Sequence, residues 1–199
     1  RALNKLKKTA ATTEDGLNIE LLANIESTED IKQLHSAGAD GVGLFRSEYL
    51  YLNRDTLPTE DEQYEVYSTL IKKLKGKQLT IRTVDLGVDK NPRWFGQNAT
   101  PNGSLNPALG LTGIRLCLAE PVMFRTQMRA ILRAAAHGKV NMMWPMVASL
   151  TELRQCGGNE LVLRLFTFGC HGGCIHGTTL ILINRLIKIM TDVQPCPVR

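Results

Sequence analysis

The sequence predicts an α/β fold in which parallel strands alternate with helices, as in the first half of a (β/α)8 TIM barrel. Three observations support this prediction. Short apolar runs alternate with amphipathic stretches between residues 18 and 146. The apolar runs are nearly continuous, as in strands covered on both faces. Most of them end on charged or polar side chains, and functional groups of parallel α/β folds lie at those carboxyl ends. A doubly wound open sheet is the alternative.

The elements follow from the pattern in order. Four apolar runs predict strands at residues 19–25, 41–45, 78–86 and 140–146. Four stretches between and after them predict helices over residues 27–38, 59–75, 109–118 and 121–136. Ser27, with Asp30 three residues later, has the spacing of a helix N-terminus, as does Thr59. Glu62 completes a capping box with Thr59, and Gly38 suits the residue that ends a helix.

Composition restricts the class of protein. The 199 residues, 43% hydrophobic and 22% charged, suit one globular domain with a sizeable core. A net charge of +5 with 6% aromatic residues is too weak a signal for a nucleic-acid-binding protein. Five cysteines form no even framework, which favours a reduced, cytoplasmic protein, and no apolar stretch is long enough to span a membrane. The chain opens on Arg1 without an apolar leader, so we expect a fragment or processed product without a signal peptide.

Two arginines, Arg46 and Arg82, stand at the ends of neighbouring predicted strands. Because adjacent parallel strands bring their carboxyl ends together, we expect both guanidinium groups to be unpaired and open to one cavity. Arginine is permanently charged and can donate to two oxygens at once, which suits a phosphate group. The alternative is that these arginines pair with Glu48 and Asp85, and spacing alone does not decide between the two.

Longer motifs point to one family. The stretches are GADGVGLFRSEYLYLNRDTLPTEDEQYEVY, TIRTVDLGVDK, NPALGLTGIRL and FRTQMRAILRAAAHGKVNMMWPMVASLTELR. In this order they resemble the C-terminal, phosphoenolpyruvate (PEP)-binding half of Enzyme I, the PEP-protein phosphotransferase of the bacterial sugar phosphotransferase system. The NPALGL motif is most similar to the Enzyme I-type modules of multiphosphoryl transfer proteins. The resemblance extends from about residue 5 to residue 155.

The resemblance implies a TIM barrel that binds PEP and Mg²⁺ and forms a homodimer. In that family the phosphoryl group passes to a histidine on a separate domain, then to a histidine phosphocarrier protein for sugar uptake. The family's GLFR and RT-x-D motifs fall on Arg46 and Arg82, which are thereby implied to contact PEP, and its GDK motif places Lys90 beside them. Pyruvate phosphate dikinase and PEP synthase share the barrel, but the RTVDLGVDK string favours Enzyme I.

Departures from the family pattern support a rival hypothesis. Val88 replaces a glycine of the family's GGDK motif, and Thr112 stands where the family has an arginine, so a weaker hold on an anion is expected. The family's Mg²⁺-binding Glu and Asp and its catalytic cysteine would lie beyond residue 155, where none is found. We therefore predict a partial barrel domain over residues 1–155 and a divergent tail over 156–199, explained by a shifted reading frame or a fusion. The rival hypothesis is a catalytically inactive half-barrel, a pseudogene product or an interaction fragment.

Two further features have ordinary structural interpretations. Cys117 lies in an apolar helical stretch and is predicted to be a core thiol, not a nucleophile. Arg125, Arg129 and Arg133 recur every four residues, as on a solvated helix face.

Overall fold

The computed structural model describes residue 7 and residues 9–86 and 110–157. In this part of the chain four strands pair in parallel and form one sheet in the order β3-β4-β5-β6. The strands are β3 (Leu22–Ile25), β4 (Gly41–Arg46), β5 (Leu79–Arg82) and β6 (Val140–Met143). Their spatial order follows their order along the chain, without the reversal that defines a doubly wound sheet.

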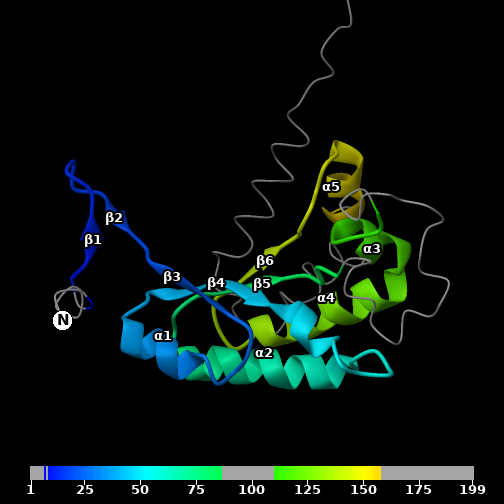
Figure 1. Cartoon of the computed structure of the whole chain (residues 1–199), viewed down its shortest axis with the longest axis horizontal. Coiled ribbons are helices and arrows are strands. Elements are labelled where there is room, and N and C mark those ends of the chain that lie inside the picture. The colour runs from blue at the N-terminus through cyan, green and yellow to red at the C-terminus, as the bar shows by residue number, and fades with distance from the viewer. Residues whose placement is uncertain (1–6, 8, 87–109, 158–199) are drawn as a thin grey trace, which may run out of the picture.

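Three of the described helices cover one face of this sheet. They are α1 (Ile31–Ala37), α2 (Glu60–Leu74) and α4 (Pro121–Ala135), and α3 (Ile114–Ala119) and α5 (Leu150–Gly157) lie near the end of β6. In Figure 1, α1, α2 and α4 all lie below the strands, and α2 packs against α4. One helical layer on a sequentially ordered parallel sheet is the arrangement of a barrel segment. The predicted α/β class is confirmed; within the described residues the sheet stays open and does not close into a barrel.

Two buried apolar clusters hold these layers together. The first lies between the sheet and the helices α1, α2 and α4, and includes Phe45, Leu70 and Ile131. The second surrounds α3 and includes Cys117 and Cys156. Burial raises the pKa of both thiols to about 12, so they are protonated at neutral pH. The prediction that Cys117 is a core thiol is confirmed.

The first helix begins later than predicted. α1 starts at Ile31, not at residue 27, because the Asp30 carboxylate accepts hydrogen bonds from the backbone N–H groups of Glu26 and Ser27, each at 2.9 Å. This side chain closes a turn over residues that would otherwise form the first helical turn. Gly38 follows the helix in the left-handed conformation with φ 81°, as predicted.

Strands β3, β5 and β6 are shorter than predicted, α3 begins later than predicted, and four short elements were not predicted. β5 ends at Arg82 and β6 at Met143, two residues before Pro145, which has no N–H to donate. The additional elements are the antiparallel pair β1 (Ala11–Thr12) and β2 (Asn18–Ile19), the 3₁₀ helix η2 (Ser47–Leu50), and α5. The predicted capping box is confirmed: the Thr59 hydroxyl accepts from the Glu62 N–H, and the Glu62 carboxylate accepts from the Thr59 N–H.

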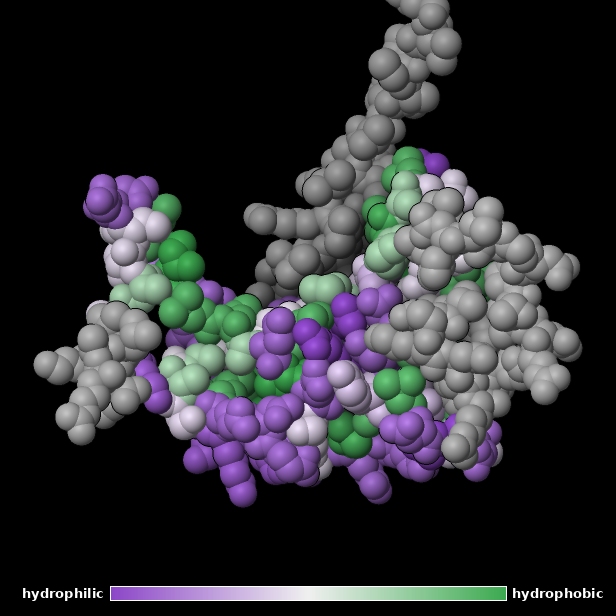
Figure 2. Space-filling model, in the orientation of Figure 1, coloured by the Kyte–Doolittle hydropathy of each residue, from purple (hydrophilic) through white to green (hydrophobic). Residues whose placement is uncertain are grey.

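The surface of the helical layer is polar, as Figure 2 shows below the sheet. Arg129 and Arg133 of α4 reach Glu60 at the start of α2, each at 2.7 Å, so these two arginines tie the helices together in addition to facing solvent. No helix in the described part of the chain combines the length and apolar character needed to cross a membrane.

Candidate functional site

Arg46 and Arg82 end adjacent strands at the same level of the sheet. In the parallel ladder between β4 and β5 the two residues are direct partners. The residue directly before each arginine, Phe45 in β4 and Ile81 in β5, is fully buried in the first apolar cluster. The core therefore fixes the backbone of the two strands up to the point where their charged side chains leave it.

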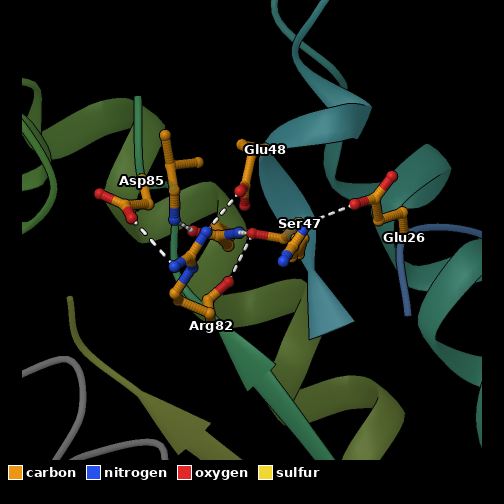
Figure 3. A network of polar contacts seen from close by, with 8 residues as sticks. Glu26, Ser47, Glu48, Arg82 and Asp85 are labelled. Atoms are coloured by element: carbon orange, nitrogen blue, oxygen red, sulfur yellow. Dashed lines mark hydrogen bonds and ion pairs between the residues drawn. The ribbon is translucent and has the colours of Figure 1, made fainter. Parts of the chain in front are cut away.

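The Arg82 guanidinium lies between two carboxylates, as Figure 3 shows. It donates to Glu48 Oε1 through Nη2 and pairs with Asp85 Oδ2 through Nη1 at 3.0 Å. The Glu48 side chain is only 2% exposed and that of Arg82 19%. Breaking this pair would leave a buried carboxylate without its cation, which is costly. The second Glu48 oxygen, Oε2, and the Arg82 Nε have no hydrogen-bond partner within the described residues.

The Arg46 guanidinium has a different partner and pairs with Glu26, which follows β3. Both side chains are about 40% exposed, and they line a pocket of about 370 Å³ between β3 and α1. The hydrogen bond to Glu26 raises the pKa of Arg46 further above its ordinary value. The Tyr49 hydroxyl also hydrogen-bonds Glu26, and this contact raises the pKa of Tyr49.

The structure corrects the prediction of two unpaired cations open to one cavity. The backbones of Arg46 and Arg82 lie side by side, but each guanidinium is paired with carboxylate, and they point to different partners. For Arg82 the alternative prediction, ion pairs with Glu48 and Asp85, is confirmed. For Arg46 the partner is Glu26, 20 residues earlier, which the sequence analysis missed. The available signal was its place directly after the predicted first strand.

A buried network of hydrogen bonds connects these strand ends to helix α4. Gln127 of α4 donates to the Ser47 hydroxyl at 2.9 Å and accepts from the Val84 N–H at 3.0 Å. The Ser47 hydroxyl in turn donates to the Arg82 carbonyl at 2.5 Å. Gln127 and Ser47 are fully buried. The sequence analysis did not identify them; the signal was a glutamine on the apolar face of an amphipathic helix.

The remaining candidate positions contribute less. Lys90 and the tail beyond residue 157 lie outside the described residues. Thr112 is half-buried just before α3. Within the described residues no group of three or more His, Cys, Asp or Glu side chains is arranged to hold a metal ion. The carboxylates beside the strand ends, Glu26, Glu48 and Asp85, already pair with Arg46 or Arg82, so they do not fit a Mg²⁺ site.

Comparison with known proteins identifies the family. Residues 1–162 match the PEP-binding domain of the PEP-utilising enzymes. The chain belongs to this family. It is 44% identical over 154 residues to the phosphoenolpyruvate-protein phosphotransferase of Staphylococcus epidermidis, covering 77% of this chain and 26% of that protein. The identity is 45% over 152 residues to the protein of the same name from Staphylococcus carnosus, covering 76% of this chain and 26% of that protein.

A third relative comes from another genus. The phosphoenolpyruvate-protein phosphotransferase of Geobacillus stearothermophilus is 46% identical over 151 residues, which cover 76% of this chain and 25% of that protein. The resemblance inferred from the motifs is thereby confirmed. The chain spans about a quarter of the length of the curated relatives it matches.

Proposed function

We propose that this chain is the PEP-binding part of a phosphoenolpyruvate-protein phosphotransferase. That enzyme transfers the phosphoryl group of PEP to one of its own histidines and then to a histidine phosphocarrier protein for sugar uptake. The observation that carries the proposal is the pairing of Arg46 with Arg82 in the parallel ladder, at the carboxyl ends of β4 and β5. Parallel α/β proteins bind their ligands at these ends.

The two arginines are proposed to bind the phosphate and carboxylate groups of PEP. Phosphoryl transfer depends mainly on positioning and on neutralising charge, which fixed guanidinium groups provide. Arg46 and its partner Glu26 are both about 40% exposed, so an incoming anion can replace this carboxylate at low cost. Arg82 is proposed to keep its two carboxylates and to contribute its permanent positive charge at the same strand ends. Lys90, in the GDK-type motif, is proposed as a further cation beside the same site.

The remaining parts of the reaction are assigned to other regions of the enzyme. The described residues contain no group suited to a metal ion, so the Mg²⁺ site is proposed to lie outside them. The phosphorylated histidine is proposed to lie on a separate domain, as the family resemblance implies. The domain is proposed to extend over residues 1–155, with a divergent tail over 156–199. We further propose a cytoplasmic location, dimerisation through this domain, and no transfer of phosphate by these 199 residues alone.

Titration of the chain with PEP, followed by calorimetry, tests the proposal. We expect weak binding by the wild-type chain and at least about tenfold weaker binding by Arg46→Ala and by Arg82→Ala, because each loses a charge-assisted contact. Arg129→Ala is the matched control for Arg46→Ala, since it also removes an arginine from an exposed ion pair but lies on the outer helical layer. Binding that survives both strand-end substitutions would show that the anion site lies elsewhere.

A transfer assay tests the separate proposal that these 199 residues bind PEP but transfer no phosphate on their own. The wild-type chain is incubated with radiolabelled PEP, Mg²⁺ and a histidine phosphocarrier protein. The inactive fragment predicts binding without label on the phosphocarrier. Label on the phosphocarrier would overturn the inactive fragment and leave the PEP-binding role in place.

A further inference from the structure

Gln127 of α4 occupies an unusual position for an uncharged polar side chain. It is completely buried, and both ends of its amide are hydrogen-bonded. The Nε2 group donates to the Ser47 hydroxyl at 2.9 Å and to the Tyr67 hydroxyl at 3.3 Å. The Oε1 atom accepts from the Val84 N–H at 3.0 Å. A buried amide that loses such partners costs stability, so its presence calls for a specific role.

On the side of β5 that faces β4, side-chain hydrogen bonds that involve Gln127 take the place of backbone pairing beyond Arg82. The strand stops at Arg82, and on the β4 side the next backbone groups are held by side chains. The Arg82 carbonyl accepts from the Ser47 hydroxyl at 2.5 Å, and the Val84 N–H donates to Gln127. Because buried backbone groups need partners, these two bonds fix the path of the chain as it leaves the sheet.

The two residues that Gln127 holds are neighbours of the two carboxylates around Arg82. Ser47 directly precedes Glu48, and Val84 directly precedes Asp85. Glu48 and Asp85 pair with the two terminal nitrogens of the Arg82 guanidinium, one on each side (Figure 3). One amide from the helical layer therefore fixes both carboxylates that orient this arginine.

We propose that Gln127 is a positioning residue for the anion site: it sets the direction of the Arg82 guanidinium by holding Ser47 and Val84 in place. Gln127 does not contact the ligand. The expected effect of Gln127 on PEP affinity rests on the proposed function. Its expected effect on the orientation of Arg82 does not. The two can therefore fail separately.

Gln63 of α2 provides a matched control. It is also a buried glutamine, and its amide accepts from the Tyr51 and Tyr67 hydroxyls at 3.0 and 3.2 Å. Its Nε2 donates to the Pro58 carbonyl at 3.2 Å. Within the described residues Gln63 bonds neither Ser47 nor Val84 and meets Gln127 only through the shared Tyr67 hydroxyl. Its loss therefore removes comparable hydrogen bonds while Ser47 and Val84 keep their partner Gln127.

The first measurement is ¹⁵N NMR of the arginine side chains without ligand, on the wild-type chain, Gln127→Met and Gln63→Met. Paired guanidinium nitrogens exchange slowly with water, and comparison with Arg82→Lys assigns the Arg82 signals. We expect these signals to be lost in Gln127→Met and kept in Gln63→Met at a temperature where both variants are folded by circular dichroism. Retention of slow exchange in Gln127→Met would overturn the proposal.

The second measurement is PEP titration of the same proteins. We expect Gln127→Met to bind about tenfold more weakly, since small displacements of a binding group have large effects, and Gln63→Met to stay within about twofold of wild type. Equal losses in both variants would show a general structural effect and overturn the proposal. If the wild-type chain does not bind PEP, the proposed function fails and the NMR result alone decides the role of Gln127.

Rescue by a conservative variant completes the test and also serves if Gln127→Met does not fold. In Gln127→Glu a protonated carboxyl can donate through its O–H and accept from the Val84 N–H, whereas the ionised form cannot donate. Burial raises the pKa of a carboxyl and so favours its protonated form, and the protonated fraction increases as pH falls. We expect affinity relative to wild type at the same pH to recover to within about threefold toward pH 5.5. A loss of the same size at every pH would overturn the proposal.

Discussion

The two strand-end arginines differ in how strongly their carboxylate partners hold them. The Arg46–Glu26 pair is about 40% exposed on both sides, and such pairs contribute at most about 1 kcal/mol. The Arg82–Glu48 pair is largely buried, and separating it would leave an unpaired charge away from water. Arg46 is therefore the group that can change partner when an anion arrives, while Arg82 stays oriented.

This difference predicts the effect of Glu26→Gln. The substitution removes the negative charge that competes with the ligand for Arg46, so PEP should bind about two- to fivefold more tightly, in line with the small value of an exposed pair. Calorimetric titration measures the change. Glu20→Gln is the control, because Glu20 accepts a hydrogen bond from Gln78 near the amino end of β5, away from the site. Unchanged or weaker binding by Glu26→Gln would contradict the expectation.

A second prediction at this scale concerns the buried thiols. Burial raises the pKa of Cys117 and Cys156 to about 12, so at pH 8 both are protonated and shielded in the second apolar cluster. With the other three cysteines changed to serine, iodoacetamide should label the native chain slowly and the urea-unfolded chain rapidly. Mass spectrometry measures the labelling. Fast labelling of the native chain would contradict burial of these thiols.

At the scale of single elements, helix ends show how local chemistry sets boundaries. Thr59 and Glu62 exchange hydrogen bonds at the start of α2, and Lys75 ends the helix in the left-handed conformation with φ 53°. Thr59→Ala removes the hydroxyl acceptor and should lower the free energy of unfolding by about 1 kcal/mol. Urea denaturation measures the change. Thr56→Ala, at an exposed position of the preceding loop, should change it by less than about 0.5 kcal/mol; equal effects would argue against the cap.

The turn before α1 predicts a dependence on pH. Hydrogen bonds from the N–H groups of Glu26 and Ser27 lower the pKa of Asp30 below its ordinary value of 3.8. The unfolded state then binds protons more readily, so this contribution to stability is present above pH 3.8 and is lost as pH falls through the lower folded value. The wild-type free energy of unfolding should thus fall more steeply below that pH than that of Asp30→Asn. Urea denaturation at stepped pH measures both slopes; parallel curves would contradict the assignment.

The sequence predicted the elements whose signals are local. The apolar run of β4 and the capping box of α2 are encoded in adjacent residues, and the structure has them where the pattern places them. α1 and β5 differ from the prediction because a side chain replaces regular backbone pairing: Asp30 in the turn before α1, and Gln127 after Arg82. Such replacements depend on contacts that periodicity does not record.

The candidate site also has a part that the sequence could predict and a part that it could not. The ladder position of Arg46 beside Arg82 follows from parallel topology and could be predicted. Ion pairing with Glu26 depends on the direction of a side chain across two strands, and the role of Gln127 depends on an 80-residue separation from Ser47. Neither leaves a pattern of spacing in a single sequence.

At the scale of the whole molecule, α4 joins the two apolar clusters. Ile131 and Ala134 belong to the cluster beneath the sheet, whereas Phe124 and Met128 belong to the cluster around α3. Gln127 lies on this helix between Phe124 and Met128, and its amide bonds Ser47 after β4 and Val84 beyond the end of β5. A helix that supplies side chains to both clusters transmits the loss of one to the other, so the described region should unfold as one unit.

Matched leucine substitutions test this cooperativity. Leu70 lies in the first cluster and Leu116 in the second, and both are buried to within about 1%. Each change to alanine should lower the free energy of unfolding by about 2–5 kcal/mol, and Val122→Ala, 68% exposed on α4, by less than about 0.5 kcal/mol.

Two probes decide whether the clusters unfold together. Far-ultraviolet circular dichroism reports on all helices, and the fluorescence of Trp144, in a Trp94→Phe background, reports on the second cluster, against which Trp144 packs. Because α4 links the clusters, Leu70→Ala should shift both midpoints in urea by the same amount, although it lies in the other cluster. If Leu70→Ala moved the circular dichroism transition and left the Trp144 transition at its wild-type midpoint, the two clusters would be separate folding units, and α4 would not couple the sheet to the region around α3.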